Sequence, residues 1–349
     1  MNEILNQISM LFNRKKTIDS LLNMMSGTII KKEISKIIFN EKLFNEIGNN
    51  YFTSGRANKL WNKSQINYFK LKNQQPNNPD NILIYKILGK IPLNVTQIKE
   101  KIGHLPLPFK VVNRYYDYTT IPNTWYVDFA NEHLGGHIGQ FVQEEKMFFI
   151  FPELMAITYL SRSNDPDYKE FEYIDKKDQP YNERTGAIVI TNVLKSLKSE
   201  GTEKMDGYYG NLNKDACFEK EELKKECVDD EKCCYHNNII AIDAYHVSPK
   251  NNVKDYNKQT LETYITKAYN GFKLANNISN TKPITIETGL WGSGMFGNHG
   301  PTMLAVQVIA ARLSGVNVTL CIGSNNDIFT TTNDVNNTIP VLLEHLGWN

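Results

Sequence analysis

The spacing of apolar positions changes along the chain and divides it into two regions. In the first hundred residues apolar side chains recur every three or four positions, which predicts helices over 4–12, 18–25 and 34–47, with a helix or a strand over 83–88. A run with two prolines, 105–108, marks the end of this region. The pattern therefore predicts a mostly helical accessory region that ends at residue 108.

Beyond that boundary, short apolar runs alternate with amphipathic stretches and glycine turns. The expected strands lie at 111–118, 126–129, 187–193, 239–244, 284–288 and 315–322, and the expected helices at 260–272, 301–313 and 338–346. This alternation predicts an α/β fold over residues 109–349, with helices on both faces of a sheet. Residues 196–236 are charged and lack an apolar period, so we expect an insertion there.

The composition narrows the classes of function. The 349 residues carry a net charge of +1, so no basic field points to duplex nucleic acid as a partner. No run of 18 apolar residues is present, and the first thirty residues alternate charge with apolarity, so neither a membrane span nor a secretory signal is predicted. The odd number of cysteines, five, fits a reducing compartment. We expect an intracellular protein, cytoplasmic or nuclear, that does not bind membranes.

Four of the cysteines lie in the expected insertion together with a histidine: Cys217, Cys227, Cys233, Cys234 and His236. Their spacing lacks the paired short arms of an ordinary structural zinc site. Thiols in a loop are therefore favoured over a metal site.

The stretch 126–155 combines a strand, a glycine turn and a group of polar residues. Asp128 lies within the expected strand and Asn131 near its end, where side chains of an α/β sheet meet ligands. Gly135 and Gly136 follow, and glycines allow positive φ and close approach of backbone amides to an anion. This order of features predicts a binding loop.

Next along the chain come Gln143, Glu144 and Glu145, directly before an apolar run. Two neighbouring carboxyl groups that are partly buried oppose each other's ionisation, so one can hold a proton near neutral pH and deliver it to a leaving oxygen. The alternative is that the two glutamates begin a solvated helix, where acids favour the N-terminal dipole.

A second glycine turn follows another expected strand. The sequence 284–296 leads through Thr288 into Gly292, Gly294 and Phe296, and the helix expected over 301–313 comes next. Exposed amides followed by a helix N-terminus favour a diphosphate without requiring lysine.

These motifs resemble those of the poly(ADP-ribose) glycohydrolase family. That family has a Val-Asp-Phe-Ala-Asn strand end, three glycines, Gln-Glu-Glu and an Asn-Pro-Glu-Leu-like tail, here 127–131, 135–136, 143–145 and 151–154. Its Thr-Gly-x-Trp-Gly-x-Gly-x-Phe-Gly turn corresponds to 288–297. Its Ile-Val-Ala-Ile-Asp-Ala run corresponds to the expected strand 239–244.

The resemblance implies a three-layer α/β/α fold of macrodomain type with a mixed sheet, and hydrolysis of the ribose–ribose bonds of poly(ADP-ribose) to release ADP-ribose. It implies that Glu145 acts first as acid and then as base, and that Glu144 grips ribose hydroxyls. Asp128 would support these two side chains. Gln143 and Asn131 would orient the terminal ribose. Neither a metal nor a cofactor is implied; the partners would be poly(ADP-ribose) or ADP-ribosylated proteins, bound by a monomer.

Further substrate contacts are implied for the amides of Gly135, Gly136, Gly292 and Gly294, for Thr288 and Phe296, and for Ile322 against the adenine. The chain departs from the family pattern at His137, which replaces the third glycine before a shorter loop, and at Ala187, Leu320 and Ile322, which replace aromatic residues. Two alternatives therefore stay open: a module that binds ADP-ribose or its polymer without cutting it, and a hydrolase of single ADP-ribose adducts.

Overall fold

The computed structural model describes residues 28–53, 55–74, 81–89, 93, 109–114, 116, 118, 121–136, 143–163, 165–197, 236–323 and 332–348. The helices expected over 4–12 and 18–25, the proline run, His137 and residues 198–235 of the expected insertion lie outside them.

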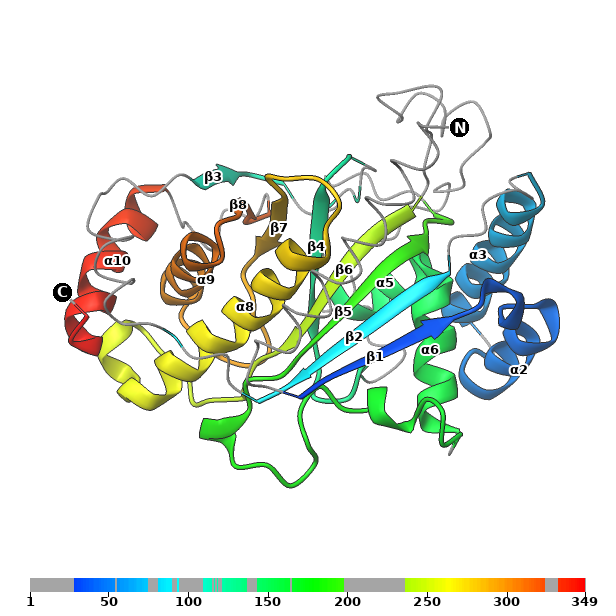
Figure 1. Ribbon diagram of the computed structural model, residues 1–349, viewed down its shortest axis with the longest axis horizontal. Coiled ribbons are helices and arrows are strands. Elements are labelled where there is room, and N and C mark those ends of the chain that lie inside the picture. The colour runs from blue at the N-terminus through cyan, green and yellow to red at the C-terminus, as the bar shows by residue number, and fades with distance from the viewer. Residues whose placement is uncertain are drawn as a thin grey trace, which may run out of the picture.

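Eight strands form one mixed sheet with helices on both faces (Figure 1). The strands are β1 (Thr28–Ile34), β2 (Ile82–Leu88), β3 (Phe109–Val112), β4 (Thr124–Ala130), β5 (Ala187–Leu194), β6 (His236–Asp243), β7 (Thr285–Gly289) and β8 (Asn317–Cys321). The α-helices are α2 (Glu41–Tyr51), α3 (Gly55–Gln74), α5 (Gln143–Ile150), α6 (Pro152–Arg162), α8 (Lys258–Ile278), α9 (Gly300–Ser314) and α10 (Thr332–Leu346). Short 3-10 helices are η1 (Lys36–Ile38), η2 (Lys169–Phe171), η3 (Tyr181–Glu183) and η4 (Val253–Asp255).

The strand order is β1-β2-β5-β6-β4-β7-β8-β3. The pairs from β1 to β6 are antiparallel, and those from β6 to β3 are parallel. Carboxyl ends of parallel strands meet at one edge of a sheet, so the loops after β4, β6, β7 and β8 gather there. This carboxyl edge is where an α/β sheet binds ligands.

Two hydrophobic clusters lie on opposite faces of the sheet. In β4, Trp125 and Val127 belong to one cluster and Tyr126 and Ala130 to the other, as the two-residue period of a strand requires. Helices α8, α9 and α10 cover the first face, and α2, α3, α5 and α6 cover the second. Figure 1 shows these two groups to the left and right of the sheet. The α/β/α fold class expected from the sequence is confirmed.

Before residue 108 the structure adds one strand that was not expected and decides between the two alternatives for another segment. Residues 28–34, which precede and begin the helix expected over 34–47, form the edge strand β1. The ambiguous run 83–88 is strand β2, which pairs with both β1 and β5. The described part of the accessory region thus adds two strands to the main sheet and two helices to one of its faces. The division at residue 108 stays a prediction.

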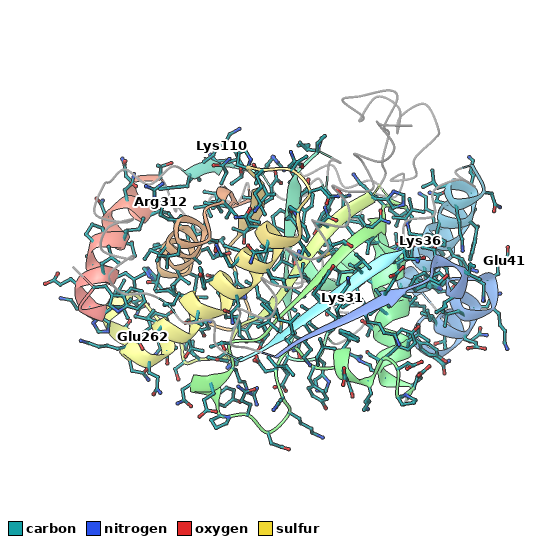
Figure 2. All side chains as sticks on the ribbon, in the orientation of Figure 1. Lys31, Lys36, Glu41, Lys110, Glu262 and Arg312 are labelled. Carbon is teal, nitrogen blue, oxygen red and sulfur yellow. The ribbon has the colours of Figure 1, made fainter. Side chains whose placement is uncertain are left out.

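Charged side chains of both signs lie at the outline of the molecule, Glu41, Lys110 and Glu262 among them (Figure 2). This distribution agrees with the net charge of +1. Among the described helices, none combines the length and the apolar character needed to cross a bilayer.

Candidate functional site

Three carboxyl groups are buried at the end of β4 and the start of α5. Asp128 lies between Tyr126 and Ala130 on the strand, so it faces the α5 layer, and its exposed fraction is 0%. Glu144 and Glu145 lie in the first turn of α5 with exposed fractions of only 2% and 3%. The alternative of a solvated helix start is therefore wrong. Strand and helix bring the three predicted acids together inside the protein.

Glu144 holds the loop that joins β4 to the rest of the site. Its Oε1 accepts a hydrogen bond from the amide of Gly135 at 2.6 Å, and its Oε2 accepts one from the amide of Asn131 at 3.0 Å. Both glycines of the loop have positive φ, +85° at Gly135 and +48° at Gly136. A Cβ at Gly136 would lie 2.6 Å from Glu144 Oε2 and 3.3 Å from Glu145 Oε1. The loop therefore packs directly on both glutamates.

Burial opposes the ionisation of Asp128 and Glu144. Burial and the nearby charge of Glu145 raise the pKa of Asp128 well above its ordinary value. Neither carboxylate oxygen of Asp128 has a hydrogen-bond partner among the described residues. Burial, Asp128 and Glu145 also raise the pKa of Glu144, against the opposing effect of its two amide donors. Both shifts favour the protonated form of the carboxyl group.

Gln143 is tied to the main chain of β4. The two strands β4 and β7 pair only from Thr124 to Tyr126, after which β7 continues with β8 alone. Beyond that point Gln143 Oε1 accepts a bond from the Phe129 amide at 2.8 Å, and Nε2 donates to the Val127 carbonyl at 3.3 Å. The Gln143 side chain thus replaces missing strand partners. Its expected role in orienting a ribose stays a prediction.

The carbonyl groups of the first glycine loop are held by an arginine that sequence reasoning did not single out. Arg162, at the end of α6, donates to the carbonyls of Leu134 at 2.9 Å and of Gly136 at 3.2 Å. A basic residue in the last turn of a helix is common, so the position of Arg162 in the sequence does not indicate this contact. The loop is clamped from two sides, by Glu144 through amides and by Arg162 through carbonyls.

The two glycine turns differ in whether their backbone amides already donate hydrogen bonds within the protein. The amide of Gly135 donates to Glu144 and that of Gly136 to the His133 carbonyl at 3.0 Å, so both are engaged inside the protein. Within the described part of the chain, the amides of Gly292 and Gly294 donate no hydrogen bond. The expectation that all four would hold a diphosphate therefore needs a correction: a ligand must displace existing bonds at the first turn.

The second turn, residues 290–298, is anchored on the end of β6. The indole of Trp291 is fully buried and donates to the Ile242 carbonyl at 3.1 Å. Gly292 has φ of +69°, and a Cβ there would lie 2.6 Å from that of Ala244. Because β6 neighbours β4, this anchor brings the second turn to the same edge as the acid group.

Asn298 joins the loops of this edge and was missed in the sequence. Its Nδ2 donates to the carbonyls of Tyr245 and Gly292, both at 3.1 Å. Its Oδ1 accepts from the hydroxyls of Tyr256 at 3.2 Å and Tyr264 at 3.1 Å. An asparagine after a glycine turn is usual in any loop, so the sequence offered no sign that this side chain is buried.

The other predicted contacts are divided between core and surface. Thr288 is fully buried and its hydroxyl bonds to Gln307. Phe296 and Ile322 are half-buried, at the second turn and directly after β8. Leu320, which replaces an aromatic residue of the family pattern, is fully buried in the core. The substrate-binding roles of the first three stay predictions.

A buried ion cluster supports the same edge. Lys267 of α8 is fully buried and bridges Asp175 at 2.7 Å and Asp243 at the end of β6. Asp175 also accepts from the Gly186 amide at 2.6 Å. The cluster thus fixes the segment before β5 to β6 and α8. In the sequence Lys267 looked like part of the polar side of an amphipathic helix.

A pocket of about 510 Å³ opens elsewhere, between η4 and the first turns of α9 and α10. Lys254, His299, Pro301 and Asp334 are among its lining residues, and none of the predicted site residues is. The acids lie on the opposite face of the sheet. The candidate site is therefore placed on the buried acids rather than on this pocket. In the described ranges no set of three or more acid, histidine or cysteine side chains is arranged to hold a metal.

Comparison with known proteins gives one family match. Residues 183–329 match the family model "Poly (ADP-ribose) glycohydrolase (PARG), Macro domain fold". The matched segment holds β5 to β8, α8, α9 and the second glycine turn, and the acid group precedes it. The family resemblance seen in the sequence is thereby confirmed over this segment. No curated protein matches the chain.

Solved structures show weaker similarity. Poly(ADP-ribose) glycohydrolase from Deinococcus radiodurans in complex with ADP-ribose is 15% identical, with 72% of this chain and 92% of that chain covered and a TM-score of 0.40. An Oceanobacillus iheyensis macrodomain with ADP is also 15% identical, with 69% and 94% covered and a TM-score of 0.34.

Proposed function

We propose that this protein hydrolyses the ribose–ribose bonds of poly(ADP-ribose) and releases ADP-ribose. The premise is the match of residues 183–329 to the poly(ADP-ribose) glycohydrolase family. The observation that carries the proposal is the buried group of Asp128, Glu144 and Glu145 at the carboxyl edge of the sheet. A protein that only binds ADP-ribose has no need for three carboxyl groups buried together. An enzyme that must protonate a leaving oxygen does.

In the proposed reaction Glu145 donates its proton to the departing ribose oxygen as the glycosidic bond breaks. The sugar carbon gains positive charge, and the negative charge held in the acid group stabilises it. Water then adds to that carbon, and its proton returns to Glu145, which restores the acid. Asp128, buried without a partner among the described residues, favours its neutral form and so lets the negative charge rest on a glutamate.

The second glycine turn supplies the proposed diphosphate contacts. The amides of Gly292 and Gly294 make no hydrogen bond within the described residues, and they lie at the same edge as the acids. Backbone amides at a glycine turn bind an anion through fixed dipoles. The first turn has another role in this account: its amide bonds to Glu144 hold that carboxylate, and with it Glu145, in place.

The test is to incubate the protein with labelled poly(ADP-ribose) and to separate the products by chromatography. Release of free ADP-ribose supports the proposal. Unchanged polymer that nevertheless binds with measurable affinity would indicate a binding module instead. Release of ADP-ribose only from proteins that carry a single unit, with the polymer left intact, would indicate a hydrolase of single adducts.

A further inference from the structure

A buried lysine of strand β2 lies where the pattern of the strand predicts an apolar side chain. Ile82 and Ile84 are fully buried on the face that α5 covers, and Lys86 is the next residue on that face. Lys86 is 5% exposed, and burial lowers the pKa of its ammonium to about 8, against the opposing effect of the nearby carboxylates of Asp175 and Glu170. An apolar side chain would fill this place without the cost of burying a charge, so the ammonium indicates a specific contact.

The ammonium holds a segment that lies between α6 and β5. Its Nζ donates to the carbonyl of Glu170 at 2.6 Å and to the carbonyl of Tyr173. These acceptors lie in η2 and just after it, in the main α/β region, whereas Lys86 comes from the accessory region. Hydrogen bonds from a charged donor are stronger than those between neutral groups, so this contact fixes the main chain of the segment.

The same segment is paired with the first glycine loop. Two main-chain hydrogen bonds, of 3.0 and 3.1 Å, join residues 132–134 to residues 172–174 as a short antiparallel bridge. Tyr173, whose carbonyl Lys86 binds, lies at the centre of this bridge, and its ring packs on that of His133 with 4.1 Å between the centroids. The lysine therefore braces the loop through one intermediate segment.

We propose that Lys86 is a positioning residue for the reaction: it fixes the segment on which the first glycine loop rests, and so keeps the buried acid group in place. Gly135 comes directly after the bridge and donates its amide to Glu144 Oε1 at 2.6 Å. Glu144 is followed by Glu145 in the first turn of α5. The inference rests on the proposed function, in which Glu145 is the acid. The accessory strand β2 thus helps to hold the acids and does not only extend the sheet.

The test compares Lys86→Met, which keeps an unbranched side chain of similar size and removes its donors, with Lys72→Met. Lys72 is the matched control, because it also donates to two main-chain carbonyls, those of Lys36 at 2.9 Å and Phe39 at 2.7 Å, in η1 and directly after it. For each variant we would measure turnover of labelled polymer, affinity for ADP-ribose by calorimetry, and hydrogen exchange of the Leu134 amide. Thermal denaturation shows that each variant is folded.

In Lys86→Met, turnover should fall about tenfold, which is less than the roughly 100-fold that a 1 Å misplacement costs. Affinity for ADP-ribose should stay within about threefold, because the loop holds the acids and the second turn holds the diphosphate. The Leu134 amide should exchange about tenfold faster, since the segment that it binds is no longer fixed. Lys72→Met should change none of the three.

Normal turnover or unchanged exchange in Lys86→Met, or equal effects in Lys72→Met, would overturn the inference alone. A loss of ADP-ribose affinity as large as the loss of turnover would overturn it as well, because Lys86 would then act on binding. If the natural protein leaves the polymer uncut, the proposed function fails and this inference with it.

Discussion

Replacement of Gly136 by alanine tests the packing of the first glycine loop on the two glutamates. Gly136 has φ of +48°, in a region where an L-residue costs about 1–2 kcal/mol. The added Cβ would also lie 2.6 Å from Glu144 Oε2, closer than atoms of this kind can approach. Glu144 must then move, and its 3.0 Å bond from the Asn131 amide is lost.

The expected cost follows from these two effects. Loss of one hydrogen bond to a charged group is worth about 1.5–3 kcal/mol. Together with the backbone term, Gly136→Ala should lower the free energy of unfolding by about 2.5–5 kcal/mol. Because Glu145 Oε1 would be 3.3 Å from the new atom, the acid must also shift by a few tenths of an ångström. Turnover should therefore fall, but by less than the roughly 100-fold that a 1 Å misplacement costs.

The chain offers a matched control in Gly347. Its φ is +73°, and a Cβ there would meet no atom within 4 Å. Gly347→Ala should therefore cost only the backbone term, about 1–2 kcal/mol, and leave turnover unchanged. Urea denaturation gives the stabilities, and release of ADP-ribose from labelled polymer gives the turnover. If the two variants behave alike in both assays, the loop does not pack on the acids as described.

Three further predictions concern the buried polar groups. Lys267→Met leaves Asp175 and Asp243 buried without their cation, so the free energy of unfolding at neutral pH should fall by about 3–5 kcal/mol; a loss below 1 kcal/mol in urea denaturation would contradict this. The folded-state pKa of Asp128 is raised, so the stability that its proton gives is complete below the unfolded pKa of about 4 and is lost as pH rises through the folded pKa. The urea midpoint should therefore fall less with rising pH in Asp128→Asn than in the natural protein. If the midpoints of the two proteins change with pH in parallel, the pKa of Asp128 is not raised. Gln143→Leu leaves a strand amide without its acceptor, so it should destabilise by about 1–3 kcal/mol, which an unchanged thermal midpoint would exclude.

The parts of the site that could be predicted are those set by local sequence. The two-residue period of β4 places Asp128 on the same face as Tyr126, and a first helical turn follows the glycine loop, so the acids come together without any long-range information. The glycines at positive φ were also expected, because few other residues adopt that conformation readily.

The parts that could not be predicted depend on partners far away in the sequence. Strand β1 carries Lys31 among its apolar residues and lies at the sheet edge, where it pairs with β2; Lys31 there lies opposite Tyr85, which a local pattern cannot show. The engagement of the Gly135 amide depends on a side chain of the next helix, and that of the loop carbonyls on Arg162. Burial of Lys267 depends on two carboxylates from other elements. Polar contacts of this kind are fixed by tertiary structure alone.

The most direct test of the central claim is the Glu145→Gln variant, which keeps the size of the side chain and removes its acid function. Affinity for ADP-ribose, measured by calorimetry, should stay within about threefold of the natural protein, whereas turnover of poly(ADP-ribose) should fall about 1,000-fold, as expected for loss of a general acid. Glu41→Gln, at an exposed glutamate of α2, should change neither quantity. Near-normal turnover by Glu145→Gln would contradict the role given to the buried acid group.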